Sequence, residues 1–196
     1  MWKRRMREEK PQKGKGRKRI FAGVIIAVVV LCTVIVLGNQ SYTVEQAIEM
    51  GSRGNNSFIC EEIIYQKKMK DGRELVVYGN PEGNICSAII KKTALFYKAE
   101  KILGGLTANP VNEKKVKMEV VSYDYFRFYL IGVITDDAVA CVRYGEDIMD
   151  MAEYKGTRVV IALDEDKIGN PQYYTKGFQV LDGEGNILES VPPKLY

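Results

Sequence analysis

Residues 20–38 form a run of nineteen residues without a charged side chain, and this run constrains the chain more than any other feature. As a helix rising about 1.5 Å per residue, it would span roughly 28 Å, close to the thickness of the hydrocarbon core of a bilayer. Its Val and Ile content favours a strand in water, but a single segment in lipid satisfies its backbone only as a helix. The sequence therefore predicts one transmembrane helix over residues 20–38.

Charge is distributed unevenly on the two sides of this run, and the asymmetry predicts an orientation. Residues 1–19 hold ten basic and two acidic residues, whereas residues 39–196 hold 19 basic and 23 acidic residues. The positive-inside rule keeps the basic tail in the cytoplasm and places the rest of the chain outside. The tail has too few apolar residues to form a core, so we expect it to be disordered. The membrane lipid bilayer is thus an expected partner, and the acidic body argues against nucleic acid.

Two alternative interpretations of the amino-terminal segment are less favoured. A cleaved signal peptide would use Val36 and Gly38 before the cut, but the apolar run is longer than a usual signal core and lacks an A-x-A-like end. A lipoprotein would be modified at Cys32, but Leu31 stands where a small residue is needed. An uncleaved signal-anchor helix fits better.

Residues 39–196 are predicted to form one extracytoplasmic β-rich domain, because 158 residues suit a single core and no long linker divides them. Thr43 and Gln46 have the spacing of a capping box, and Gly51 is placed to end a helix, so we expect a short helix over residues 44–50. From Phe58 onward, short β-branched stretches alternate with turn residues, which predicts roughly nine strands.

The connections between these predicted strands are too short for parallel crossovers. Asp71 and Gly72 favour a type I′ hairpin turn, and residues 182–185 favour a second hairpin. We therefore predict a mainly β fold with a minor α part, in which antiparallel sheet is packed as a sandwich or roll.

The order TVEQAIEM, IIYQKKMKDGRELVVYGN, SAIIKKTALFYKAEKILGG and FQVLDGEGNILES resembles a group of uncharacterised extracytoplasmic proteins of Gram-positive bacteria. Those proteins are small domains held to the membrane by one helix or a lipid. The resemblance covers residues 41–190 and implies a Gram-positive cell surface. Its motifs are turns and core positions, so it implies no catalytic residues.

The chain has no histidine, which excludes Ser-His-Asp and Cys-His catalysis and every His-ligated metal site. Cys60 and Cys86 are expected on strands two apart in a meander, beyond the reach of a disulfide, so we expect buried thiols. Asp164 and Asp166 alternate as in a calcium loop, but the Gly and the distal Glu of an EF-hand are missing. The sequence therefore predicts no metal and no cofactor.

Formal candidates for histidine-independent hydrolysis remain. Paired carboxylates occur at Asp147 and Asp150, among other places, and Ser87 is followed by Lys91 and Lys92. Such pairs arise in nearly any chain, so we expect a domain without catalytic activity.

The most unusual segment is YDYFRFY, which has five aromatic residues in seven. If it is one strand, alternation places Tyr123, Tyr125, Arg127 and Tyr129 on one face and the two phenylalanines on the other. The favoured interpretation is that the tyrosine face simply covers the surface of a sheet. The functional alternative is that it contacts a ligand or a partner.

These observations predict a single-pass protein whose outer domain binds another envelope or membrane protein. The partner face would be Tyr123, Tyr125, Arg127 and Tyr129. The alternatives are a module that binds cell-wall glycan or peptide, and a histidine-independent hydrolase.

Overall fold

The computed structural model describes residues 23–33, 40–53, 55–107, 115–124, 127–165 and 176–192. The chain divides into two compact units, residues 1–40 and residues 41–196. In the first unit, residues 23–33 are helical. Among the described residues, no helix is long and apolar enough to cross a membrane. The predicted span over residues 20–38 lies partly, and the tail over residues 1–19 wholly, outside the described residues.

The second unit begins with the short helix α2 (Val44–Gly51), which confirms the predicted helix. The Thr43 side chain caps it by accepting a hydrogen bond from the Gln46 N–H, and the Gln46 side chain accepts one from the Tyr42 N–H. Gly51 does not end the helix in a left-handed conformation but is its last residue. A Cβ at Gly51 would lie 2.8 Å from Ile102 Cδ1, so glycine lets the helix approach the sheet closely.

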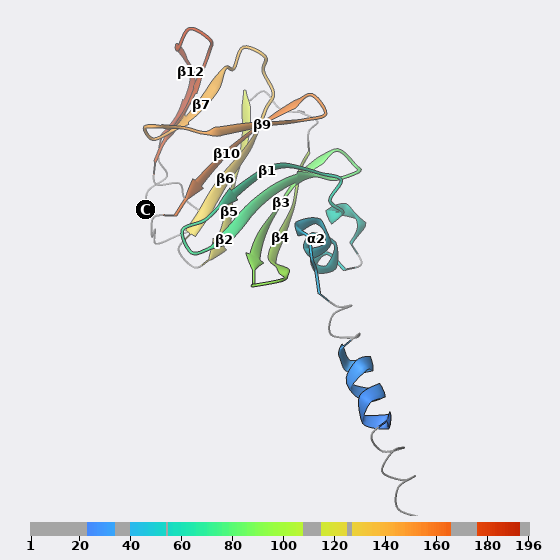
Figure 1. The fold of residues 1–196 in the computed structure, drawn as a ribbon. Helices are drawn as coiled ribbons and strands as arrows, with labels where there is room; N and C mark the ends of the chain where they lie inside the picture. Colours follow the sequence, from blue (N-terminus) through green and yellow to red (C-terminus); the bar gives the residue numbers. More distant parts are fainter. Residues whose placement is uncertain are drawn as a thin grey trace, which may run out of the picture. The chain divides into compact units, whose positions relative to one another are not determined.

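Three antiparallel four-stranded sheets follow the one-turn helix η1 (Asn56–Phe58). Figure 1 shows how most of their strands are arranged. Sheet A contains β1 (Glu62–Lys68), β2 (Arg73–Gly79), β3 (Asn84–Lys92) and β4 (Tyr97–Thr107) in that order. Sheet B has the order β5 (Val116–Asp124), β6 (Arg127–Ile134), β10 (Thr157–Asp164), β9 (Asp150–Tyr154). Sheet C has the order β12 (Ile187–Val191), β11 (Phe178–Leu181), β7 (Cys141–Tyr144), β8 (Asp147–Ile148).

The sheets differ in how the chain builds them. Sheet A is a meander of consecutive strands. Sheets B and C are interleaved, because the chain forms one hairpin of B, then one of C, then returns to B and again to C. The β6–β10 and β7–β11 pairings then join the two hairpins of each sheet. All described pairings are antiparallel, as predicted.

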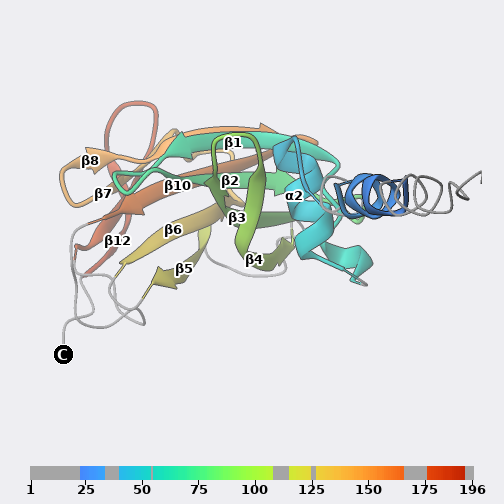
Figure 2. The same cartoon turned by 60° about the horizontal axis from the view of Figure 1, so that its bottom comes forward.

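Three hydrophobic clusters separate the layers. The first lies between sheets A and B and includes Leu75, Ile89 and Ile161. The second lies between sheets B and C and includes Leu130, Val142 and Val160. The third lies between α2 and the other face of sheet A (Figure 2), and Ile48 is its most buried helix residue. The order of layers is therefore helix, sheet A, sheet B, sheet C.

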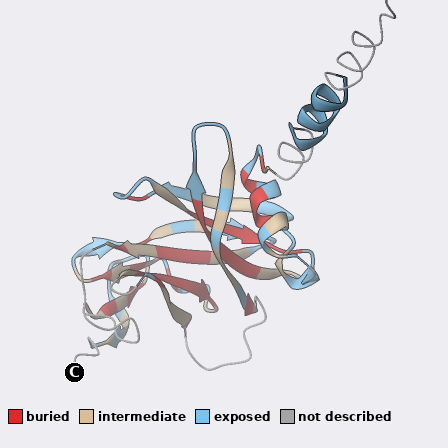
Figure 3. Cartoon of the chain, turned by 90° about the horizontal axis from the view of Figure 1, so that it is seen from below, coloured by how far each residue is buried: buried red, intermediate tan, exposed pale blue. Residues whose placement is uncertain are grey.

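Sheet B is the middle sheet of this stack and contributes buried residues to the clusters on both of its faces. Figure 3 shows that the buried residues run along the strands of the sheets. Val159 faces sheet A, Val160 faces sheet C and Ile161 faces sheet A again. Two-sided burial explains why the central strands of sheets A and B are apolar without alternation. The fold is mainly β with a short helix, as predicted, but it stacks three sheets where a sandwich or roll was expected.

Two turns differ from the sequence prediction. In the β1–β2 turn only Gly72 has a positive φ, 85°, so Asp71 and Gly72 do not form a type I′ turn. The β9–β10 turn instead has positive φ at both central residues, 48° at Lys155 and 79° at Gly156, as a type I′ turn requires. Strands β8 and β9 were not predicted, because the stretch over residues 147–154 is rich in acids.

Candidate functional site

The YDYFRFY segment is not a single strand. Tyr123 lies near the end of β5, whereas Arg127 and Tyr129 lie at the start of β6. Tyr125 lies outside the described residues. The alternation that the sequence analysis assumed across the whole segment therefore applies only within each strand.

The two described tyrosines of this segment are buried between sheets A and B. Tyr123 is 7% exposed and Tyr129 is fully buried. Their rings stack with centroids 6.2 Å apart and planes inclined by 27°. Phe128 faces the opposite cluster, between sheets B and C, so it lies on the other face from the tyrosines, as predicted. Because the tyrosine rings fill the interior, Arg127 is the one predicted partner residue among the described ones that lies near the surface, at 26% exposure.

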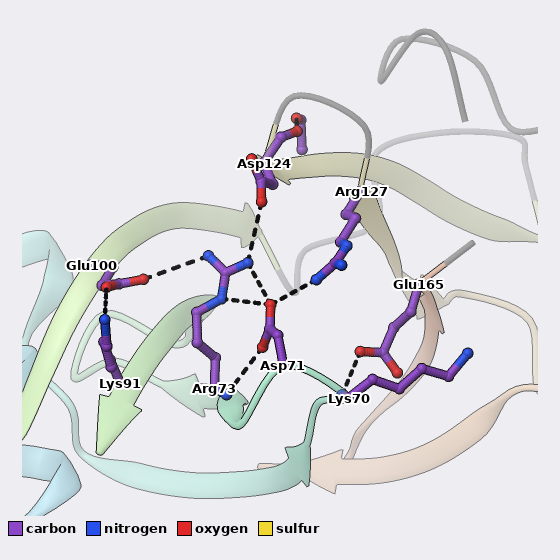
Figure 4. Close-up of polar contacts among 9 residues, drawn as sticks. Lys70, Asp71, Arg73, Lys91, Glu100, Asp124, Arg127 and Glu165 are labelled. Carbon is purple, nitrogen blue, oxygen red and sulfur yellow. Dashed lines mark hydrogen bonds and ion pairs between the residues drawn. The ribbon is translucent and has the colours of Figure 1, made fainter. Parts of the chain in front are cut away.

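A cluster of charged side chains surrounds the outer end of this tyrosine pair, and Figure 4 shows its members. At its centre, the Asp71 carboxylate in the β1–β2 turn accepts hydrogen bonds from Arg73 Nε at 2.9 Å and Nη2 at 2.6 Å. The same carboxylate accepts a hydrogen bond from Arg127 Nη1 at 2.7 Å. Asp71 thus joins an arginine of sheet A to an arginine of sheet B.

Arg73 extends the cluster to both neighbouring edge strands. Its guanidinium lies 3.4 Å from the Glu100 carboxylate on β4 and 3.3 Å from the Asp124 carboxylate on β5. It also covers the Tyr123 ring at 5.3 Å from the centroid, within the range of a cation–π contact. Nearby, the Lys70 N–H donates a hydrogen bond to Glu165 at 2.6 Å, which ties the same turn to the end of β10.

The charged groups of this cluster pair with one another and have a structural role. Hydrogen bonds from Arg73, with the charge of Arg127, hold the pKa of the Asp71 carboxyl below its usual range. Both guanidiniums are already paired with carboxylates, so neither is available as an isolated cation for an anionic ligand. The arrangement therefore fixes sheet A against sheet B.

The Tyr123 hydroxyl is buried and makes no hydrogen bond among the described residues. Burial also raises the pKa of this phenol, so it stays protonated. An unsatisfied buried hydroxyl costs about 1 to 3 kcal/mol, and its removal restores that energy. We expect Tyr123→Phe to raise the free energy of unfolding by about 1 kcal/mol, measured by urea denaturation of the full chain in detergent micelles.

Tyr129→Phe is the matched control for this prediction. The Tyr129 hydroxyl lies 2.5 Å from Ser87 Oγ, and both groups are buried. Its removal leaves Ser87 without that partner and should lower the free energy of unfolding by about 1 kcal/mol. Equal losses in the two variants would mean that the Tyr123 hydroxyl is satisfied.

Strand β5 presents an open edge of sheet B. The Thr135 N–H donates a hydrogen bond to the Lys115 carbonyl at 2.9 Å, so Lys115 and Thr135 are a hydrogen-bonded pair. In an antiparallel ladder such pairs alternate with pairs that are not hydrogen-bonded, and β5 and β6 keep the same register beyond Lys115. Residues 117, 119 and 121 therefore bond to β6, while the backbone groups of Met118 and Val120 face away from it. Among the described residues nothing pairs with these outward groups of Met118 and Val120. Farther along, Lys101 Nζ donates a hydrogen bond to the Ser122 carbonyl.

The candidate groups for hydrolysis are not brought together. The Ser87 hydroxyl is bonded to Tyr129, whereas Lys91 Nζ lies 3.9 Å from Glu100 and Lys92 Nζ lies 5.0 Å from the centroid of the Tyr97 ring. The four cysteines are free, and Cys60 precedes β1 instead of lying on a strand as predicted. Cys86 is buried, whereas Cys60 is only partly buried. Burial raises the pKa of the Cys60 thiol to about 11, which disfavours the nucleophilic thiolate.

A cleft of about 270 Å³ beside β8 and β9 is the feature that sequence reasoning missed. The Asp150 carboxylate on its wall accepts hydrogen bonds from Tyr65 Oη at 2.5 Å and Lys67 Nζ at 2.8 Å. Asp164, which is buried, accepts one from Tyr144 Oη at 3.1 Å. Within the described part of the chain, no group of three metal-ligating side chains occurs here or elsewhere. The acidic residues at 147 and 150 were the only signal of this cleft in the sequence.

Comparison of the chain with protein-family models, with curated proteins and with solved structures found no match.

Proposed function

We propose that the chain is a single-pass membrane protein whose outer domain is non-catalytic and binds another envelope or membrane protein. The amino terminus would lie in the cytoplasm and residues 39–196 outside, at a Gram-positive cell surface. The observation that carries the binding role is the open edge of β5. A partner segment in extended conformation would add to this edge as a further strand of sheet B.

Strand β5 is a sheet edge with little protection against pairing. Natural edge strands are kept from pairing by bulges, charges, short length or cover. Strand β1 carries a bulge near Ile63, β4 has two register shifts opposite β3, and β12 has one opposite β11. Strand β8 has two residues, and β4 is also packed against α2. Strand β9, the other edge of sheet B, keeps one register with β10 but has only five residues. Strand β5 keeps one register with β6 from Val116 to Ser122 and shifts only between Ser122 and Asp124.

The membrane part of the proposal is supported by residues 20–38 and their flanking charge. The described residues 23–33 are helical, and seven large aliphatic side chains among them are 52% to 63% exposed. Such a surface is unfavourable in water and favourable in lipid. A domain restricted to a membrane meets neighbouring proteins at raised effective concentration, so it needs little intrinsic affinity.

Val120→Pro tests the β5 edge. The Val120 N–H faces away from β6, so proline removes no hydrogen bond of the sheet but blocks an added strand. We expect the variant to stay folded and to lose the partner. The measurement is photo-crosslinking from a reactive residue at Lys117 in the full chain in its native membrane, followed by mass spectrometry.

Val121→Pro is the control, because the Val121 N–H bonds to β6 and its loss should unfold sheet B. Met118→Pro, with an outward N–H, repeats the test if Val120→Pro does not fold. An identical crosslinked partner from a folded Val120→Pro chain would contradict strand addition. Crosslinks found only between two copies of this chain would show self-association instead of a foreign partner.

A further inference from the structure

The turn between β3 and β4, residues 93–96, carries the most exposed large apolar side chain among the described residues of the second unit. Leu95 is 73% exposed. The turn is closed by hydrogen bonds from the Thr93 N–H and hydroxyl to the Phe96 carbonyl, at 2.8 and 3.0 Å. Tyr42, itself 52% exposed, packs edge-on against the Phe96 ring with centroids 5.3 Å apart. We call Tyr42 and residues 93–96 the apolar tip.

The chain itself keeps the apolar tip close to the end of the uncharged run. Ser41 forms a β-bridge with Tyr97, and the Tyr97 N–H donates to the Ser41 carbonyl at 2.8 Å. Only two residues, Asn39 and Gln40, lie between Gly38, the last residue of the run, and Ser41, which makes three Cα–Cα steps. A fully extended chain of that length spans at most about 11 Å. The chain therefore tethers the tip within a short distance of Gly38, the end of the uncharged run.

The composition of the tip and its flanks matches the interface of a bilayer. Aromatic rings are enriched at the level of the lipid headgroups, and lysine is attracted to anionic lipid. The segment over residues 91–98, KKTALFYK, holds three lysines and no acidic residue. All three lysines are exposed. The acidic groups that face it are Glu100, 3.9 Å from Lys91, and Glu74 near Lys92.

We propose that the apolar tip inserts into the headgroup region of the same bilayer that holds residues 20–38, with Lys91, Lys92 and Lys98 on anionic lipid. The proposal rests on the membrane anchoring in the proposed function. It adds a second point of attachment, which restricts how the outer domain turns about its tether.

The test places tryptophan reporters in the full chain. Trp2, the only native tryptophan, is first changed to Phe. Leu95→Trp reports on the tip, Val29→Trp on the anchor and Ile187→Trp on an exposed site of β12. Each protein is reconstituted in vesicles of phosphatidylcholine and phosphatidylglycerol that carry lipids brominated near the headgroup or near the bilayer centre.

We expect lipids brominated near the headgroup to quench Leu95→Trp and shift its emission to shorter wavelength. Lipids brominated near the centre should quench Val29→Trp, and neither lipid should quench Ile187→Trp. A second reporter, Tyr42→Trp, should be quenched in the native background and lose that quenching when combined with Leu95→Asp. A tryptophan at position 95 could bind lipid by itself. The two Tyr42→Trp proteins avoid this problem, because residue 95 is not a tryptophan in either of them.

The outcomes separate the tip from the anchor. If Val29→Trp is quenched and both tip reporters are not, the tip proposal is overturned while the anchoring stands. If Val29→Trp is not quenched either, the anchoring fails and the tip proposal fails with it. A blue shift of Leu95→Trp without quenching would show that protein and not lipid covers the tip, and this also overturns it.

Discussion

Gly79→Ala should lower the free energy of unfolding by about 3 kcal/mol, because the added methyl group meets a ring that cannot move aside. A Cβ at Gly79 would lie within the van der Waals radii of three ring carbons of Tyr154. That ring is 2% exposed, and its hydroxyl donates to Glu61 at 2.6 Å or to the Asn80 carbonyl at 2.8 Å. Displacement of the ring would break this contact between sheets A and B.

Thermal and urea unfolding of the full chain in detergent micelles would measure this loss. For a domain of this size, we expect the midpoint temperature to fall by about 10 °C. Gly183→Ala is the matched control, because nothing lies within 4 Å of a Cβ at Gly183. The control should change stability by less than about 0.5 kcal/mol. Equal stability of the two variants would show that sheets A and B are not packed through Tyr154.

Asp71→Asn should lower the free energy of unfolding by about 2 kcal/mol at neutral pH. The substitution keeps the size of the side chain and removes the charge that Arg73 and Arg127 share. These arginines are only 17% and 26% exposed, so water replaces the lost counter-charge poorly. Asp71 is also mostly buried, at 24% exposure, so solvent screens its ion pairs only in part and they contribute to stability.

The pH dependence of this difference has a definite sign. Because the folded state lowers the pKa of Asp71, the pairing contributes fully above the pKa of the unfolded carboxyl, near 3.9, and is lost as pH falls through the folded value. The gap between Asp71→Asn and the unmodified chain should therefore close on acidification below about pH 4. Denaturant titrations between neutral and acidic pH would follow it. Glu184→Gln, an exposed acid in the β11–β12 turn, is the control and should show no comparable gap.

The strand pattern of the sequence predicted the local elements well, because hairpins and caps are set by neighbouring residues. Thr43 and Gln46 predicted the start of α2, and the β11–β12 hairpin formed around Asp182, whose carboxylate accepts the Asn186 N–H at 2.8 Å. The number of layers was not predictable in the same way. Two-sided burial of sheet B depends on which strands return to it, and β10 returns after a hairpin of sheet C.

The predicted partner face illustrates the same limit. Among the described residues of YDYFRFY, Phe128 was correctly assigned to the side opposite Tyr123 and Tyr129. Alternation, however, does not say which side meets solvent when a sheet is covered twice. Tyr123 and Tyr129 therefore became interior residues, and Arg127 became the counterpart of an aspartate 56 positions away. The open edge of β5 was visible in the sequence only as the regular pattern of residues 116–121, which does not distinguish an edge from a central strand.

The interleaving of sheets B and C has a consequence for the order of folding. Sheet A is made of neighbouring strands over residues 62–107, so it can form from local contacts as soon as those residues are available. Sheet B needs β10, and sheet C needs the strand that ends at Val191, so both wait for distant pairing. During synthesis a completed sheet A would expose Leu75, Val77 and Ile89 until sheet B covers them, and in that interval the chain is most prone to aggregate.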